Sequence, residues 1–105
     1  ERRASPREPL RLRSAKLLDA AYRFVCECRV CDRSQHGLRL VLARNYKASR
    51  RLAVHIDETR EVRAAKIVWR RGPMLGVRLG DRIRPGAIKP WDRYALRERY
   101  YGILD

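Results

Sequence analysis

A short polar segment at residues 32–37 has the side chains to bind a small polar ligand. Asp32 supplies a carboxylate, Ser34 a hydroxyl that both donates and accepts, and Gly37 a backbone that a ligand can approach closely. These residue types are also the commonest turn formers, for purely local backbone reasons. Taken alone, the segment therefore predicts a hairpin turn between two apolar stretches.

A second group of side chains that could do chemistry lies at the start of the chain. Arg2, Arg3 and Arg7 each present a planar guanidinium, which binds phosphate groups and guanine edges through two parallel hydrogen bonds. Two prolines in the same stretch exclude a helix and favour extended backbone. The sequence therefore predicts a flexible, arginine-rich arm over residues 1–9 that could close over an anion.

The composition favours an anionic partner. The 105 residues include 26 Lys and Arg against 12 Asp and Glu, a net charge of +14 with a pI near 11.0. Such a surface attracts phosphates, nucleic acid or acidic membranes. Apolar residues make up 45% of the chain, which is enough for one modest core, and we expect a single domain over residues 1–105.

The chain has neither an apolar run near the roughly 18 residues that a membrane span needs nor a signal-peptide pattern at its start. We therefore expect no membrane span and a cytoplasmic location. Because the first residue is Glu1 rather than Met, the chain could also be a segment excised from a larger protein.

Six stretches of alternating apolar and polar residues must position the arm and the polar segment. The first begins near Leu10, and the others cover residues 24–31, 38–43, 52–56, 61–71 and 75–79. In the fifth stretch the apolar positions change parity after Ala64, a slip that a β-bulge would supply. The sequence therefore predicts an all-β fold, a six-stranded antiparallel barrel over residues 10–84.

The tail at residues 85–105 has a different pattern. Two prolines and a glycine exclude a helix interior in its first part, whereas residues 91–101 have the composition of a short helix. Leu96, Tyr100 and Ile103 could share one face of that helix. We expect a C-terminal helix that lies against the barrel and uses its aromatic residues for packing.

The three cysteines, Cys26, Cys28 and Cys31, could suggest a metal site with His36 as a fourth ligand. The spacing argues against it, because Cys28 and Cys31 point to opposite faces of a strand and no second cysteine pair exists. We expect no metal, no cofactor and no disulfide, and we interpret the thiols as small apolar side chains facing inward.

The arm and the polar segment together resemble the PilZ domain family, whose members bind cyclic di-GMP. The matching motif residues are Arg3, Arg7, Asp32, Ser34 and Gly37. Their order and separation fit the family, with a pair of strands between the two groups. The resemblance covers residues 2 to about 80 and includes the strands at 65–69 and 75–79.

This resemblance implies a six-stranded Greek-key barrel with an arm that folds over the ligand. It implies that Arg3 and Arg7 clamp the ligand from the arm, and that the three motif residues of segment 32–37 form the barrel side. Arg2 completes a double arginine, which in the family is associated with a pair of intercalated ligand molecules.

Cyclic di-GMP also suits these side chains chemically. Its guanines offer the acceptors N7 and O6 to arginine, and donors on the other edge to the Asp32 carboxylate, which would reject adenine. Ser34 adds a small donor and acceptor. Trp69 either offers its ring to a base or is buried in the barrel. The remaining residues of the segment are interpreted as turn residues without a binding role: Arg33, Gln35 and His36.

We therefore predict a cyclic di-GMP receptor domain, in which the ligand orders the arm and changes the surface presented to a partner protein or a joined domain. We predict no enzymatic activity, because the sequence has no nucleophile elbow, phosphate loop or metalloprotease motif. Two alternatives are a basic barrel that binds single-stranded nucleic acid and a ligand-free interaction module on the same fold. The first is disfavoured because no strand interleaves basic and aromatic side chains.

Overall fold

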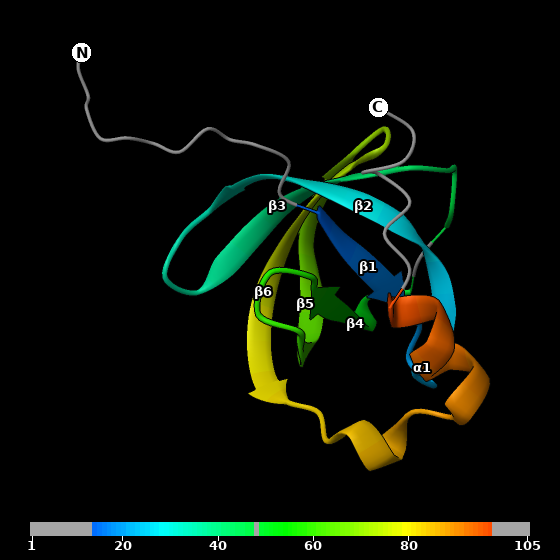
Figure 1. The fold of residues 1–105 in the computed structure, drawn as a ribbon. Coiled ribbons are helices and arrows are strands. Elements are labelled where there is room, and N and C mark those ends of the chain that lie inside the picture. The colour runs from blue at the N-terminus through cyan, green and yellow to red at the C-terminus, as the bar shows by residue number, and fades with distance from the viewer. Residues whose placement is uncertain (1–13, 48, 98–105) are drawn as a thin grey trace.

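The alternating stretches form strands that close into a barrel, with a short helix after the last strand (Figure 1). The computed structural model describes residues 14–47 and 49–97. The elements in chain order are β1 (Ser14–Leu18), β2 (Phe24–Arg33), β3 (Gly37–Leu42), β4 (Arg51–Ile56), β5 (Glu61–Arg71), β6 (Met74–Arg82), the 3-10 turn η1 (Pro85–Ala87) and α1 (Pro90–Arg97). The predicted six-stranded barrel is confirmed, while the predicted strand start near Leu10 lies outside the described residues.

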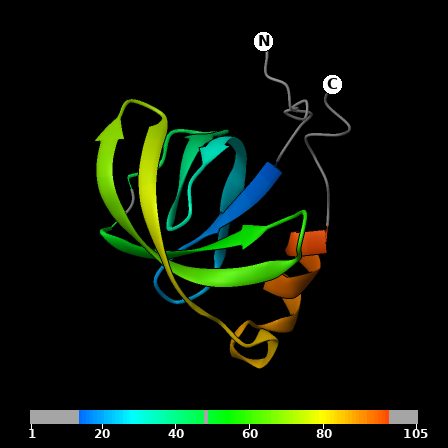
Figure 2. The ribbon, with the colours of Figure 1, turned by 90° about the vertical axis from the view of Figure 1, so that its left-hand side faces the viewer.

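Neighbouring strands pair antiparallel around the whole barrel, in the spatial order β1-β2-β3-β6-β5-β4, and β4 closes the ring against β1. Two three-stranded meanders are thus joined along two seams, β3 with β6 and β1 with β4. A fourth strand that returns to lie beside the first is the Greek-key arrangement. Figure 2 shows the strands curving around a common interior.

Side chains from alternate strand positions fill this interior. The three leucines of β3 are all buried, as the alternation predicted. Cys26 and Cys28 are also buried and pack in the same core, which confirms that they act as small apolar side chains. Cys31 is exposed, so the expectation of an inward thiol is wrong for that residue.

Strand β4 departs from the predicted alternation because both of its faces are buried. Its even-numbered residues point into the barrel as predicted, but Ala53 and His55 are buried as well. Ala53 belongs to a second apolar cluster, whose other buried members are Leu18, Val62, Ile88 and Leu96. Because Leu96 comes from α1 and Ile88 from the segment before it, the chain after β6 covers this outer face of β4.

Strand β5 contains the predicted β-bulge and a second one. Its pairing with β6 shifts register between Arg63 and Ala65, where the parity change indicated, and again between Ile67 and Trp69. Val68 has no partner in the second shift and is exposed. Trp69 shares the parity of Ala65 and Ile67, which pack inward, so the second bulge is what turns its ring to the outside.

Helix α1 begins at Pro90, whose missing amide hydrogen is harmless in a first helical turn. It lies beside the barrel near the end of β1 and the start of β2 (Figures 1 and 2). Two contacts fix it there. Leu96 is buried in the second cluster, and Asp92 Oδ1 accepts a hydrogen bond of 3.0 Å from the Phe24 amide.

Two aromatic side chains of α1 point away from the barrel. Trp91 is 67% exposed and Tyr94 61%, so the predicted packing role is wrong for both. The Lys89 ammonium lies 5.9 Å from the centroid of the Trp91 ring, within cation–π range. The predicted face through Tyr100 and Ile103 lies outside the described residues. No helix within residues 14–47 and 49–97 is long and apolar enough to cross a membrane.

A network of buried charged side chains joins β1 to the end of β4. The Lys16 side chain is 0% exposed, and its Nζ lies 3.0 Å from Asp57 Oδ2 and 3.8 Å from Glu27 Oε1. Asp57 also accepts hydrogen bonds from Ser14 Oγ at 2.6 Å and from His55 Nδ1 at 2.7 Å. Burial raises the pKa of Asp57, but these hydrogen bonds outweigh it and lower the pKa below its ordinary value of 3.8.

Replacing Asp57 with asparagine should remove the nearer of the two carboxylates beside the buried Lys16 ammonium and leave only Glu27, at 3.8 Å. We expect the free energy of unfolding at neutral pH to fall by about 3–5 kcal/mol, the usual effect of breaking a buried ion pair. Because the folded-state pKa of Asp57 is lowered, the contribution of its charge is complete above pH 3.8 and is lost as the pH falls through that lowered pKa. The difference between wild type and variant should therefore narrow below pH 3.8, as measured by urea denaturation.

Asp81→Asn is the matched control, because Asp81 is exposed and has no hydrogen bond or ion pair within residues 14–47 and 49–97. Its unfolding free energy should stay within about 0.5 kcal/mol of the wild type. A deficit of Asp57→Asn that persists unchanged into strong acid would contradict this account of the network.

Candidate functional site

The four site residues predicted in the described part of the chain lie together at one surface depression. Asp32, Ser34, Gly37 and Trp69 all line this hollow of about 430 Å³, although they come from β2, the β2–β3 hairpin and β5. It is open to solvent on the outside of the barrel. The sequence separates Trp69 from the other three by more than thirty residues, and the sheet brings them together.

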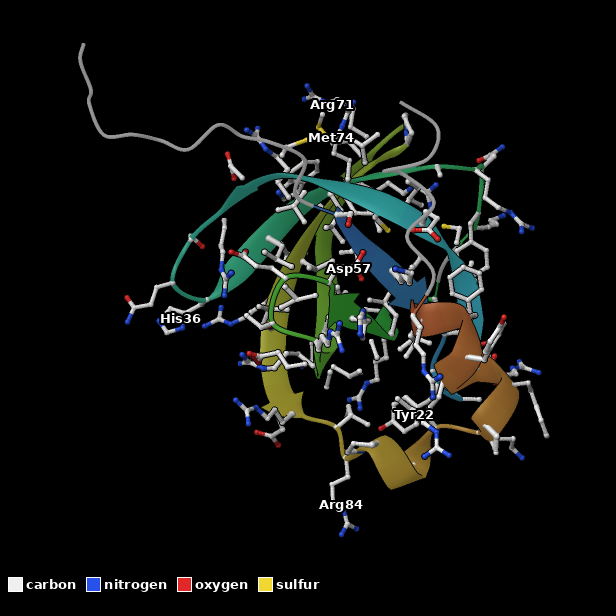
Figure 3. All side chains as sticks on the ribbon, in the orientation of Figure 1. Tyr22, His36, Asp57, Arg71, Met74 and Arg84 are labelled. Carbon is white, nitrogen blue, oxygen red and sulfur yellow. The ribbon has the colours of Figure 1, made fainter. Side chains whose placement is uncertain are left out.

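The hairpin between β2 and β3 is fixed to the barrel by backbone hydrogen bonds. The Ser34 amide donates to the Gly37 carbonyl at 3.0 Å, which closes the turn. The Leu79 amide on β6 donates to the His36 carbonyl at 2.8 Å, which ties the tip of the hairpin to a third strand. Figure 3 shows His36 at this tip, away from the body of the barrel. The predicted hairpin turn is confirmed.

Four cross-strand neighbours form a row along the depression. Asp32 on β2 is opposite Arg39 on β3, which is opposite Gly76 on β6, which in turn is opposite Trp69 on β5. Arg39 Nη2 donates to Asp32 Oδ2 at 2.6 Å. The Asp32 and Arg39 side chains are 60% and 45% exposed, and so exposed a pair contributes at most about 1 kcal/mol to stability. A ligand could therefore displace Arg39 from the Asp32 carboxylate at little energetic cost.

The Trp69 ring lies across Gly76. A Cβ built at Gly76 would overlap the indole, so only glycine leaves room for the ring at this position. Trp69 is 41% exposed, which excludes the core position and leaves part of the side chain open to solvent. A partly exposed aromatic ring held against the sheet could stack on a planar base.

Gly37 is required by the fold itself. A Cβ at this position would lie 2.6 Å from the Val77 carbonyl oxygen on β6, closer than a real side chain can approach a backbone atom. Gly37 therefore lets β3 and β6 pair closely at the rim of the depression, whatever it does toward a ligand.

The depression is also lined by residues that were not predicted to belong to a site: His36, Leu38, Arg39, Val68, Gly76, Val77 and Arg78. Arg39 and Arg78 lie at outward-facing positions of their strands, and the alternation of apolar and polar residues in the sequence does indicate this. The β2–β3 hairpin sets Arg39 opposite Asp32. The sequence does not reveal the pairing of β3 with β6, which brings Arg78 opposite Gly37 and Gly76 opposite Arg39. The depression thus combines a carboxylate, a hydroxyl, an aromatic face and two guanidinium groups, a set suited to a ligand with a planar base and anionic groups.

Comparison of the sequence with models of protein families matches residues 1–96 to the model described as the PilZ domain. Neither the curated proteins nor the solved structures gave a match. The matched segment contains every residue that lines the depression. It also contains the predicted arm residues Arg2, Arg3 and Arg7, which lie outside the described residues.

Enlarging Gly76 should displace the Trp69 ring without touching any polar site residue. In a Trp91→Phe background, where Trp69 is the only tryptophan left, we expect Gly76→Ala to shift the fluorescence emission to longer wavelength as the ring moves into water. The measurement is a steady-state emission spectrum of the native protein.

Gly80→Ala on the same strand is the control, because a Cβ there meets Ala64 only at ordinary contact distances of 3.6 and 3.7 Å. Its spectrum should match that of the parent. Identical spectra for Gly76→Ala and Gly80→Ala would contradict the close packing of Trp69 on Gly76.

Proposed function

The chain belongs to the PilZ domain family, a family of cyclic di-GMP receptors, and on that premise we propose that it binds cyclic di-GMP in the depression beside the β2–β3 hairpin. The observation that carries the proposal is the meeting of Asp32, Ser34, Gly37 and Trp69 in one surface hollow. The first three belong to the family motif, whereas Trp69 comes from a distant strand and adds an aromatic surface.

The proposed contacts follow the chemistry of guanine. The Asp32 carboxylate accepts from the N1 and N2 donors of a guanine, which adenine lacks in that arrangement, so Asp32 determines base identity. In taking this position the base replaces Arg39, which is then released toward a phosphate. Ser34 hydrogen-bonds to the ligand locally, and Trp69 stacks on a base.

The arm is the second half of the proposed site. Arg3 and Arg7 clamp the ligand from above, and Arg2 beside them favours an intercalated pair of cyclic di-GMP molecules. Closing the arm over the depression would change the surface that a partner protein or a joined domain meets. All three arginines lie outside the described residues, so this part of the proposal rests on the family motif alone.

Calorimetric titration with cyclic di-GMP, GTP and a short single-stranded RNA, all at one salt concentration, tests the proposal. We expect saturable binding of cyclic di-GMP with two molecules per chain. Asp32→Ala and Arg7→Ala should each weaken it by about tenfold or more, because each removes a charge-assisted contact.

Two controls match these variants in charge. Asp81→Ala removes an exposed carboxylate and Arg71→Ala an exposed guanidinium, and neither residue lines the depression. Both should bind like the wild type. RNA binding as strong as that of cyclic di-GMP, with the Asp32 and Arg7 variants unaffected, would instead identify a nucleic-acid-binding barrel.

The arm makes a separate prediction. Saturating cyclic di-GMP should slow amide hydrogen exchange in residues 2–9, because a clamped arm loses the freedom of an extended basic segment. Mass spectrometry of peptic peptides from this end of the chain measures it, with GTP as the control ligand. Equal exchange with and without cyclic di-GMP would disprove the closing of the arm even if the ligand binds.

A further inference from the structure

A second and larger cavity lies between α1, the β4–β5 turn and the end of β6. Its volume is about 770 Å³, within the range of about 300–1,000 Å³ that is usual for small-molecule sites. It shares no lining residue with the depression beside the β2–β3 hairpin. We call it the arginine cleft, after the four arginines in its wall: Arg60, Arg82, Arg93 and Arg97.

Three of the four arginines in the arginine cleft have no carboxylate partner in the part of the chain that the structure describes. Arg82 lies 3.7 Å from the Glu61 carboxylate, which Arg63 also contacts at 3.5 Å. Within the described residues, Arg60 and Arg97 have no ion pair or side-chain hydrogen bond, and Arg93 only donates to a backbone carbonyl at 3.5 Å. Among the described residues, three guanidinium groups of the cleft therefore lack a carboxylate partner and could bind an anion.

A buried histidine lies in the same wall. His55 is 7% exposed, and its Nδ1 is held by the Asp57 carboxylate at 2.7 Å. Because His55 lines the cleft, Nε2 is the nitrogen left for a ligand, and it has no hydrogen-bond partner in the described part of the chain. A carboxylate on the far side of an imidazole fixes the ring orientation and the tautomer, as in the supported histidines of many binding sites.

Arg60 occupies a left-handed backbone position that favours glycine. Arg60 has φ of 63° in the turn after β4, where its amide donates to the Ile56 carbonyl at 2.7 Å. Glycine adopts this conformation without penalty, whereas a residue with a Cβ is destabilised there. A long cationic side chain at a glycine position is explained if its guanidinium serves the cleft.

Five apolar residues also line the cleft: Val62, Ile83, Pro85, Ile88 and Leu96. The remaining lining residues are Thr59 and two carboxylates, Asp57 and Glu61, which are already paired with cations of the protein. We propose that the arginine cleft binds a small phosphate ester with an aromatic body, the chemistry of a mononucleotide. Arg60, Arg93 and Arg97 receive the phosphate together with His55, and the apolar wall receives the ring. This second site does not depend on the binding of cyclic di-GMP in the depression.

Titration of the ¹⁵N-labelled chain with AMP, followed by amide chemical shifts, tests the site. AMP should cause saturable shifts at residues 59–62 and in α1. Adenosine and inorganic phosphate should each bind about tenfold more weakly or worse, because each retains only one part of the contact set.

Two variants remove the cationic contacts. Arg60→Gly and Arg93→Gln should each weaken AMP binding by about tenfold. Arg60→Gly should do so without lowering the thermal midpoint, because glycine relieves the strained φ at that position. Lost binding together with retained stability separates a ligand contact from a merely structural arginine.

Arg71→Gln is the matched control, since it removes one exposed arginine at the β5–β6 turn, at the opposite end of the barrel from α1 (Figure 3). It should bind AMP like the wild type, and so should Asp32→Ala, which alters only the depression. The proposal is overturned if AMP shifts no cleft amides, if its shifts are confined to the depression, or if Arg71→Gln loses as much affinity as Arg60→Gly.

Discussion

The pairing of β3 with β6 is the constraint on which the site beside the hairpin depends. These strands belong to different meanders, and their register sets Leu38 opposite Val77 inside the barrel and Arg39 opposite Gly76 outside it. A slip of one residue would exchange the two faces and bury the arginine. Gly37 supports the register because the Val77 carbonyl occupies the space that a side chain would need. The fold and the site therefore share one requirement at this seam.

The alternation of apolar and polar residues predicted much of the fold. It predicted burial incorrectly on β4, whose outer face is covered by the chain after β6. The leucines of β3 face the core as expected because the outer side of that strand meets solvent. Ala53 and His55 on β4 were expected outside, but the chain after β6 covers them. The sequence indicated a helix over residues 91–101 and could not orient it, since Trp91 and Tyr94 are apolar enough to pack and yet face water. Leu96 and Asp92 set the orientation through contacts that are not local in sequence.

The residues of the candidate site also fall into those that local sequence predicts and those that depend on contacts distant in sequence. Asp32, Ser34 and Gly37 could be identified because they lie within six residues and their geometry is a local hairpin. Trp69 was left undecided between core and surface, since its parity matches the inward residues of β5. A bulge at Val68 reverses that parity, and nothing in the residue types announces it. Arg39, Gly76 and Arg78 join the site only through strand pairing, which a single sequence does not specify.

Two carboxylate–cation pairs in this barrel illustrate how burial sets what an ion pair can do. Asp57 and Lys16 are withdrawn from water, so the loss of either charge removes the closest ionic partner of the other in a buried setting, and the pair serves stability. Asp32 and Arg39 have shorter contact geometry but remain in solvent, where water replaces either partner easily. The exposed pair can therefore be opened by a ligand, whereas the buried pair cannot. In this barrel the exposed pair lies on a scaffold that the buried network stabilises.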